Sequence, residues 1–420
     1  MLRHSLALLS AVTFAGFSVA ADPPAKKNGK GPAYTAAPAD DANYPLLGEF
    51  SGEITVGDAT EVLGLQIRPI GGDNFDAMSF TGGLPGQDGV SGESMKLIGR
   101  RSGEMVILSG GPWAIFVSKD ACTLVDHEGN KLGKLDRVQR VSPTMHAAPP
   151  KDALVLFDGT NTEQFSNAQM TDDGLLMQGA DVRPMFTDFN LHVEFKLPYM
   201  PEASDQSRAN SGLYLQSRYE CQVLDSFAQD AVFNGCGALY RFKKPDVNMC
   251  LPPLQWQTYD IQFTAARWAS DGTKIRDAHV TSWVNGVKVQ DNVALPGPTG
   301  AGKDEAPMLL PIRMQDHGDP VRFRNVWAID RGMTMVDFPI QPTEEDLAAM
   351  KKKAEDAKVM AKAEAKAKAD AAAKKKAEAA KQAEADKKAE SEKKAAEAKP
   401  ESDAKSQDVE LNSPVSDEAK

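Results

Sequence analysis

The sequence predicts an all-β protein in which a two-sheet jelly roll follows a smaller β domain and precedes a charged single helix. Residues 191–197 alternate strictly between apolar and polar, which sends four apolar side chains to one face of a strand. Two β-type runs at 280–284 and 287–289 flank Asn285-Gly286, the dipeptide favoured in two-residue hairpin turns. No helical period of useful length occurs between 152 and 330, and this favours one sandwich with one core.

The N-terminus has the pattern of a secretory signal peptide over residues 1–20. Arg3 and His4 precede an apolar run, and Ser18-Val19-Ala20 forms a small-x-small cleavage site. The run is too short and wrongly flanked for a stable membrane span. We therefore expect a periplasmic or secreted protein without a transmembrane segment. Residues 21–41 have the composition of a linker.

Residues 42–143 are predicted to form a small accessory β domain. Short β-type runs separated by glycine, such as 62–67 and 105–108, favour a small antiparallel barrel or sandwich. Nothing in this region gathers catalytic residue types. The Pro- and Ala-containing segment 142–150 is predicted to be the hinge to the second domain at 152–330.

The C-terminal part is predicted to be a solvated charged helix over 343–400, followed by a disordered tail over 401–420. Thr343 and the three acidic residues after it give a helix start with acid in the first turn. The Ala, Lys and Glu that follow are strong helix formers, but no apolar seam recurs, so a coiled coil is disfavoured. The helix is a candidate attachment point for a cell-envelope partner.

The net charge limits the kinds of partner to expect, and the cysteines indicate where a disulfide can form. The net charge of -11 argues against a nucleic-acid partner. Cys236 and Cys250 enclose a loop that contains Gly and Pro, and in an exported protein we predict that they form a disulfide. Closing such a loop is worth roughly 3 kcal/mol in the chain-entropy model. Cys221 is expected to remain a buried thiol.

The segment from Asn210 to Ser226 carries polar side chains at alternate positions. Period two places Arg218, Glu220 and Gln222 on one face and the three residues Tyr219, Cys221 and Val223 on the other. This pattern is typical of the lining of an open sheet, although an ordinary solvated outer face would show it too.

The run from Met314 to Trp327 concentrates ionisable groups directly before an apolar strand end. It contains Asp316, His317, Arg322 and Arg324 around a Gly and a Pro. A strand that only needed to be buried would not carry so many groups that must be solvated or paired. A sugar cleft would use them, because hydroxyl groups need rigid donors and acceptors. At least one of the two arginines is expected to pair with an acid.

These motifs, in this order, resemble the 3-keto-disaccharide hydrolase family, which is linked to 3-keto-glucoside 1,2-lyase and hydratase activity. The resemblance covers 152–330 and rests on the segments 154–160, 210–226, 237–240, 256–261, 285–292 and 315–327. It implies a concanavalin-like sandwich with a carbohydrate site on its concave face and an oligosaccharide or glycoside as substrate.

The substrate class suggests the chemistry. A ketone at C3 acidifies the C2 proton, a base removes it, the C1 aglycone leaves by β-elimination, and water adds across the resulting glycal. We predict His317, Glu220 and Asp316 as catalytic residues. The predicted substrate-binding residues are Arg218, Gln222, Asn210, Tyr214, Tyr240, Gln315 and Arg322, with Trp256 as a further aromatic candidate. Each of the three rings could equally be a core residue.

Two other functions and one cofactor question stay open at this stage. The main rival is a non-catalytic carbohydrate-binding module on a cell-envelope scaffold, since the fold serves lectins as readily as enzymes. A conventional two-carboxylate glycosidase is disfavoured because Gln222 occupies the second position where an acid would stand. No cofactor is required by the sequence. A divalent metal held by His317 and carboxylates is conceivable, but no short ligand motif demands it.

Overall fold

The protein, seen in a computed structural model that describes residues 25–27, 30–90, 93–333 and 352, is all-β as predicted. The helical residues in these ranges are two short 3-10 turns, Tyr44–Leu46 and Asp205–Ser207, and the single residue Lys352. The predicted signal peptide and disordered tail lie outside the described residues, as does the charged helix apart from Lys352. In the described part, no helix is long and apolar enough to cross a membrane.

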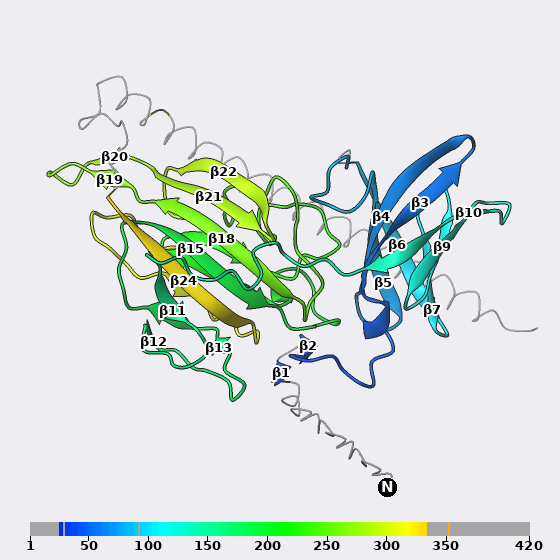
Figure 1. Ribbon diagram of the computed structural model, residues 1–420, viewed down its shortest axis with the longest axis horizontal. Helices are drawn as coiled ribbons and strands as arrows, with labels where there is room; N and C mark the ends of the chain where they lie inside the picture. Colours follow the sequence, from blue (N-terminus) through cyan, green and yellow to red (C-terminus); the bar gives the residue numbers. More distant parts are fainter. Residues whose placement is uncertain (1–24, 28–29, 91–92, 334–351, 353–420) are drawn as a thin grey trace, which may run out of the picture. The chain divides into compact units, whose positions relative to one another are not determined.

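The first domain is a closed antiparallel barrel, one of the two architectures predicted for it (Figure 1, blue to cyan). Its strands close in the order β10-β3-β4-β5-β6-β7-β8-β9. Their bounds are β3 Gly48–Val56, β4 Ala59–Pro69, β5 Asn74–Thr81, β6 Ser94–Ser102, β7 Met105–Ser109, β8 Ala114–Val117, β9 Ala121–Val125 and β10 Lys131–Val138. Alternate residues point inward and form a separate apolar core that includes Phe50, Leu65 and Val106.

The second domain is a sandwich of two sheets, as predicted. The larger sheet has the order β11-β24-β15-β18-β21-β22, and β13 also pairs with β24. Its strands are β11 Leu154–Phe157, β13 Leu176–Met177, β15 Asp188–Lys196, β18 Trp256–Thr264, β21 Ala278–Val284, β22 Val287–Leu295 and β24 Arg322–Gly332.

The smaller sheet has five short strands in the order β12-β14-β23-β16-β17. They are β12 Phe165–Ser166, β14 Ala180–Val182, β16 Ser211–Leu215, β17 Tyr219–Val223 and β23 Arg313–Met314. Two further pairs of short strands are β1 Ala25–Lys27 with β2 Gly31–Ala33, and β19 Arg267–Trp268 with β20 Lys274–Arg276.

The core of the sandwich lies between the inner faces of the two sheets. The alternation at 191–197 is confirmed, since Leu191, Val193, Phe195 and Leu197 are all buried in it. The predicted hairpin is also confirmed: Val284 pairs with Val287, and both turn residues have the positive φ that a type I′ turn requires. These two features fix which residues of each strand face outward, and the outward residues form the sites described below.

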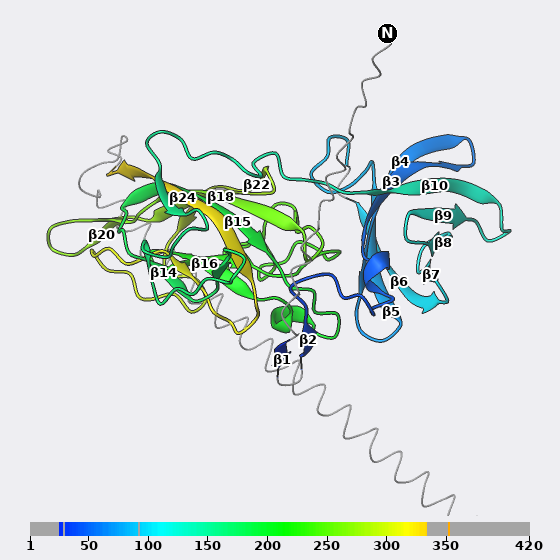
Figure 2. The same cartoon turned by 60° about the horizontal axis from the view of Figure 1, so that its bottom comes forward.

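Two segments predicted as a linker and a hinge are in fact packed against the sandwich (Figure 2). Within the predicted linker, Tyr34 exchanges backbone hydrogen bonds of 2.9 Å with Tyr199. Lys30 forms an ion pair of 3.1 Å with the buried Asp319. The first part of the predicted hinge 142–150, residues 142–147, crosses the outer face of the larger sheet and is held there by hydrogen bonds to side chains of that sheet. We call residues 142–147 the strap.

Candidate active site

One row of side chains crosses the outer face of the smaller sheet and ends at Glu220. The register aligns Asp181 of β14 with Arg313 of β23, Arg313 with Tyr214 of β16, and Tyr214 with Glu220 of β17. Asp181 and Arg313 form an ion pair of 3.2 Å, and the Tyr214 hydroxyl donates to Glu220 Oε2 at 2.8 Å. We call these four residues the Glu220 row.

Glu220 is the deepest member of the Glu220 row. Its exposed fraction is 2%, and burial raises its pKa to about 7 although the hydrogen bond from Tyr214 pulls the other way. Burial, together with the nearby Glu220 charge, also raises the pKa of Tyr214, which therefore stays protonated and donates. A carboxyl with a pKa near neutrality can accept a proton and release it at physiological pH.

Two glycines make the space in which the Glu220 carboxyl lies. A Cβ on Gly212, in the neighbouring strand, would stand 2.5 Å from Glu220 Oε1. A Cβ on Gly300 would lie 3.0 Å from Glu220 Oε2 and would clash with the ring of Tyr240. Gly300 also has φ +50, a conformation that favours glycine. Tyr240 is held beside Glu220 by its backbone N–H, which donates to the Glu220 carbonyl at 3.0 Å. Its side chain is half-buried.

Amide side chains form a second row next to the first. Gln315 is held beside Gly212 by a backbone hydrogen bond of 2.9 Å, and its Nε2 lies 3.4 Å from the Tyr214 hydroxyl. Its Oε1 is buried and has no hydrogen-bond partner among the described residues. In the amide orientation that satisfies its neighbours, Gln222 donates to Glu220 Oε1 at 3.2 Å and lies 3.1 Å from Gln206. The site therefore offers both donors and acceptors to a polar ligand.

Two of the predicted binding residues have a supporting position instead. Asn210 is buried; its backbone N–H donates to Asp319 at 2.8 Å and its side chain to the Gln206 carbonyl at 2.8 Å. Arg218 is buried in the turn before β17 and donates to the carbonyls of Asp304 and Ala306 at 3.0 and 3.3 Å. The prediction that Arg218 shares the face of Glu220 and Gln222 is therefore wrong.

Asp316 and His317 lie at the exposed edge of this face. Both are exposed, and Asp316 accepts a hydrogen bond of 2.7 Å from the backbone of Gly318. They follow Gln315 directly in the sequence, and Gln315 is held beside Gly212 by its backbone hydrogen bond. Their position over the edge of the Glu220 face and their catalytic roles both remain predictions.

Arg322 and the aromatic candidate Trp256 are on the other sheet. The Met314–Trp327 run is divided between β23 and β24, so its arginines face the outer side of the larger sheet. Arg322 donates to Gln178 Oε1 at 3.1 Å. The Arg324 guanidinium lies 3.9 Å from the centre of the Trp256 ring and donates to Glu194 at 2.7 Å. One arginine therefore pairs with an acid, as expected, but neither reaches Glu220.

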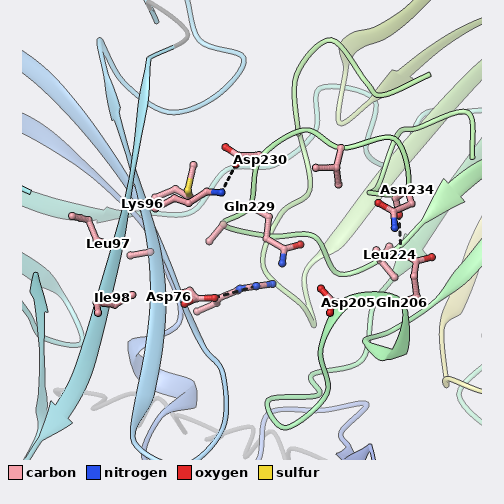
Figure 3. A pocket seen from close by; sticks show the side chains of 15 residues that line it. Asp76, Lys96, Leu97, Ile98, Asp205, Gln206, Leu224, Gln229, Asp230 and Asn234 are labelled. Carbon is pink, nitrogen blue, oxygen red and sulfur yellow. Dashed lines mark hydrogen bonds and ion pairs between the residues drawn. The ribbon is translucent and has the colours of Figure 1, made fainter. Parts of the chain in front are cut away.

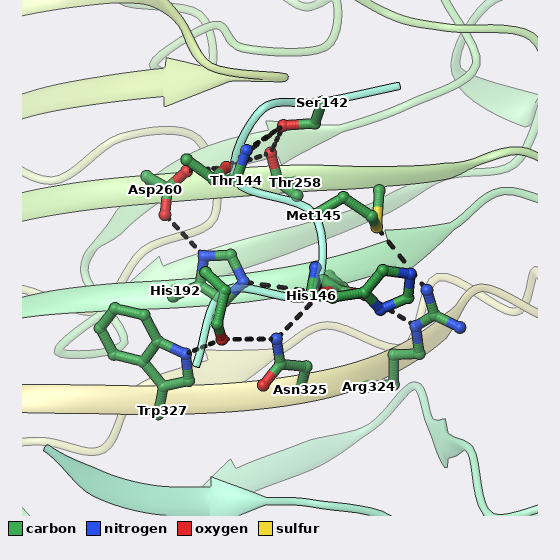
Figure 4. Close-up of polar contacts among 12 residues, drawn as sticks. Ser142, Thr144, Met145, His146, His192, Thr258, Asp260, Arg324, Asn325 and Trp327 are labelled. Atoms are coloured by element: carbon green, nitrogen blue, oxygen red, sulfur yellow. Dashed lines mark hydrogen bonds and ion pairs between the residues drawn. The ribbon is translucent and has the colours of Figure 1, made fainter. Parts of the chain in front are cut away.

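The network around Glu194 joins the strap to the larger sheet (Figure 4). Glu194 accepts hydrogen bonds from the backbone of His146 at 2.6 Å and from Asn325 at 2.9 Å. Burial opposes its ionisation, but these donors, with His192 and Arg324, outweigh it and lower its pKa to about 2. Glu194 is thus held as a carboxylate, with the opposite pKa shift to that of Glu220.

The cysteines are all free thiols in the structure, so the predicted Cys236–Cys250 disulfide is not formed there. The two side chains do lie together, and burial and the Cys236 thiol raise the pKa of Cys250. Cys221 is a fully buried thiol in the sandwich core, as expected. Among the described residues, no three His, Cys, Asp or Glu side chains are grouped so that they could hold a metal ion.

A cavity of about 400 Å³ lies where the barrel meets the sandwich, next to the amide row (Figure 3). Gln206 lines it and also contacts Gln222, so one layer of amides separates the cavity from Glu220. From the barrel come Arg68 and Lys96, and Lys96 pairs with Asp230 of the sandwich at 2.5 Å. The volume is within the range of small-ligand sites.

Two members of the Glu220 row, Asp181 and Arg313, were not found from the sequence. Strands β14 and β23 span three and two residues, too few to show period-two alternation. One signal was available for Arg313, because it stands two residues before Gln315 and a strand there would place both on one face.

The sandwich domain matches a known protein family. Residues 152–329 match the family described as 3-keto-alpha-glucoside-1,2-lyase-like domain. The chain belongs to this family. A search of curated proteins gave no match. The family assignment makes the sandwich a carbohydrate-active domain, and the barrel lies outside the matched range.

Three crystal structures from Parabacteroides distasonis, each titled as a candidate glycosyl hydrolase, are similar to the chain. The first is 32% identical, covers 43% of this chain and 84% of its own, and has a TM-score of 0.39. The second is 19% identical and covers 43% and 94%, with a TM-score of 0.32. The third is 21% identical and covers 43% and 99%, with a TM-score of 0.30.

Proposed function

We propose that the protein cleaves 3-keto glycosides by removing the C2 proton and eliminating the C1 aglycone, with net hydrolysis when water adds back. The observation that carries this is Glu220, a buried carboxyl whose pKa is raised to about 7 on the outer face of a sheet in a carbohydrate-active domain. Such a group is suited to general-base catalysis, because the best base has a pKa near the working pH.

The reaction needs one group to take the C2 proton and others to stabilise the oxyanion that develops at C3. In this proposal Glu220 takes the proton. Gln315 stands next to it with an amide N–H that can donate to the enediolate oxygen. The Tyr214 hydroxyl donates to Glu220 in the resting site and can turn to that oxygen once Glu220 has taken the proton. Gln315 Oε1, which has no partner among the described residues, accepts a hydrogen bond from a sugar hydroxyl.

The leaving oxygen at C1 needs an acid. His317 and Asp316 are the candidates, because they stand at the exposed rim where an aglycone would leave. The cavity beside Gln206 gives room for the remainder of a larger glycoside. A predicted signal peptide over 1–20 supports a periplasmic or secreted location.

A conventional glycosidase mechanism fits the Glu220 row poorly. It requires two carboxyl groups about 5–9.5 Å apart across the scissile bond. The other carboxylate of the Glu220 row is Asp181, three strand steps away, which is roughly 14 Å at the spacing of strands in a sheet. Asp181 is also paired with Arg313.

The test is turnover of a 3-keto glucoside beside the parent glucoside, followed by NMR in D₂O. The proposal expects turnover of the keto form alone. The eliminated product has no hydrogen at C2, and the hydrated product carries deuterium at C2, because the proton removed by Glu220 is replaced from solvent when water adds back. A protein that binds both sugars and converts neither would instead be a carbohydrate-binding module. Cleavage of the parent glucoside at a similar rate would contradict C2 proton removal.

A further inference from the structure

The outer face of the larger sheet carries a row of side chains with a tryptophan at each end. The register aligns Trp327 of β24 with His192 of β15, His192 with Asp260 of β18, and Asp260 with Trp283 of β21. We call these four residues the tryptophan row. The two tryptophans are three strand steps apart, roughly 14 Å, which is more than the width of one sugar ring.

A groove of about 240 Å³ runs between the two tryptophans. Both rings line it, and the polar residues Asn190, Asp260 and Gln262 lie along it. The Asn190 Oδ1 atom is buried and, among the described residues, has no hydrogen-bond partner. A buried acceptor without a partner is costly, so this atom points to a donor supplied by a ligand.

The tryptophan row is rigid at its Trp327 end (Figure 4). The His192 ring stacks on Trp327 with centres 4.9 Å apart and an angle of 17°, and its Nδ1 is 2.6 Å from Asp260. The Trp327 N–H donates to the strap at Ala147 O, 3.3 Å away, and Thr144 donates to Asp260 at 2.7 Å. This end of the tryptophan row therefore has its binding arrangement before any ligand arrives, which lowers the entropy cost of binding.

The combination of chemical groups identifies the ligand class. The faces of an indole ring suit the C–H faces of a pyranose, and a carboxylate and amides suit its hydroxyl groups. We propose that this groove binds a neutral polysaccharide chain of at least two sugar units. The site is on the opposite sheet from Glu220 and does not depend on the reaction proposed there, so it would hold the protein on a glycan surface.

The test is affinity electrophoresis of the full chain in native gels that contain hydroxyethyl cellulose, dextran or soluble starch. These polymers carry no 3-keto group, so the result does not depend on turnover. The wild-type protein should be retarded by at least one of them. Trp283→Ala should weaken that binding about tenfold, and Trp283→Phe, which keeps a flat ring, should restore part of it.

The matched control is His279→Ala, which removes a ring from the same strand and face but outside the groove. It should leave the retardation unchanged, and Trp283→Ala should leave turnover of a small 3-keto glucoside unchanged. No retardation of the wild type in any gel, or equal retardation of Trp283→Ala, would overturn the proposal. So would a wild-type dimer in sedimentation that Trp283→Ala dissociates, because the groove would then bind a second copy.

Discussion

The two outer faces of the sandwich have similar geometry, but their buried glutamates have opposite pKa shifts. Each has a row of four aligned residues with a buried glutamate in or beside it. Glu220, on the smaller sheet, has a phenol beside it and a pKa raised to about 7. Glu194, on the larger sheet, has Arg324, Asn325 and the strap around it and a pKa lowered to about 2. Burial alone does not decide whether a carboxyl is charged; the donors around it do, and Glu194 has more of them, including the Arg324 guanidinium.

This difference separates a structural carboxylate from a candidate catalytic one. A carboxylate with three donors cannot take a further proton near neutral pH, and it holds the strap in place. Glu220 accepts hydrogen bonds only from the neutral Tyr214 hydroxyl and the Gln222 amide, so it is poised to change its charge, which costs stability and serves chemistry. Mutations of the two glutamates should therefore affect different properties.

The largest expected effect is on stability, from Glu194→Gln. The amide cannot balance the Arg324 guanidinium, and removing one partner of a buried ion pair typically costs 3–5 kcal/mol. Because the Arg324 side chain is 28% exposed, we expect about 3 kcal/mol. Urea denaturation measures it, and turnover per folded molecule should stay at the wild-type level. A loss of turnover in folded protein would mean that the two faces are coupled.

Glu220→Gln should instead lower turnover and leave stability unchanged or higher. We expect at least about a hundredfold loss of 3-keto glucoside turnover, the usual scale for a general base. At pH 8 the variant should be as stable as the wild type or more so, because it no longer buries a charge. Glu163→Gln, which changes an exposed glutamate, is the control for both measurements. Wild-type turnover in folded Glu220→Gln would place the active site elsewhere.

The ionisation of Glu220 and of Glu194 should both affect how the properties of the wild type depend on pH: kcat/KM through Glu220, and stability through both. Proton removal needs ionised Glu220, so kcat/KM should rise with pH and level off above about 7. Stability should fall across the window from the ordinary pKa of 4.5 to about 7, because the folded state holds a proton there that the unfolded chain has lost. Glu194 has the reverse sign: its stabilisation is present above pH 4.5 and is lost as the pH falls toward 2.

Glu194→Gln and Glu220→Gln separate these two contributions to stability. The loss on acidification should be smaller in Glu194→Gln, and the loss between 4.5 and 7 should be smaller in Glu220→Gln. Thermal midpoints measured from pH 3 to 8 give both curves. Identical curves for Glu220→Gln and the wild type would mean that Glu220 ionises as an ordinary exposed glutamate does.

The sequence was sufficient where a strand is long enough to show its period. It placed Glu220 and Gln222 on one face correctly, since five residues of β17 alternate. It misplaced Arg218 because Gln216 and Ser217 have positive φ, so the chain turns there and the alternation cannot be extended backward. The run from Met314 to Trp327 was read as one unit, but its two ends pair with different sheets. Such non-local pairing leaves no local pattern.

The smallest expected effect comes from Gly212→Ala, which tests whether the position of the Glu220 carboxyl matters. A Cβ at this position would stand 2.5 Å from Glu220 Oε1, so the carboxyl must move by several tenths of an ångström. The displaced atom is the end of a side chain and not backbone, so stability should change by only about 1 kcal/mol. Catalysis is more sensitive, since a misplacement of about 1 Å can cost a hundredfold, and we expect a loss of about tenfold in kcat. Gly272→Ala is the matched control, because nothing lies near its Cβ position and its positive φ makes the substitution at least as strained. An equal loss of kcat in both variants would show that the effect of Gly212→Ala does not depend on the Glu220 carboxyl.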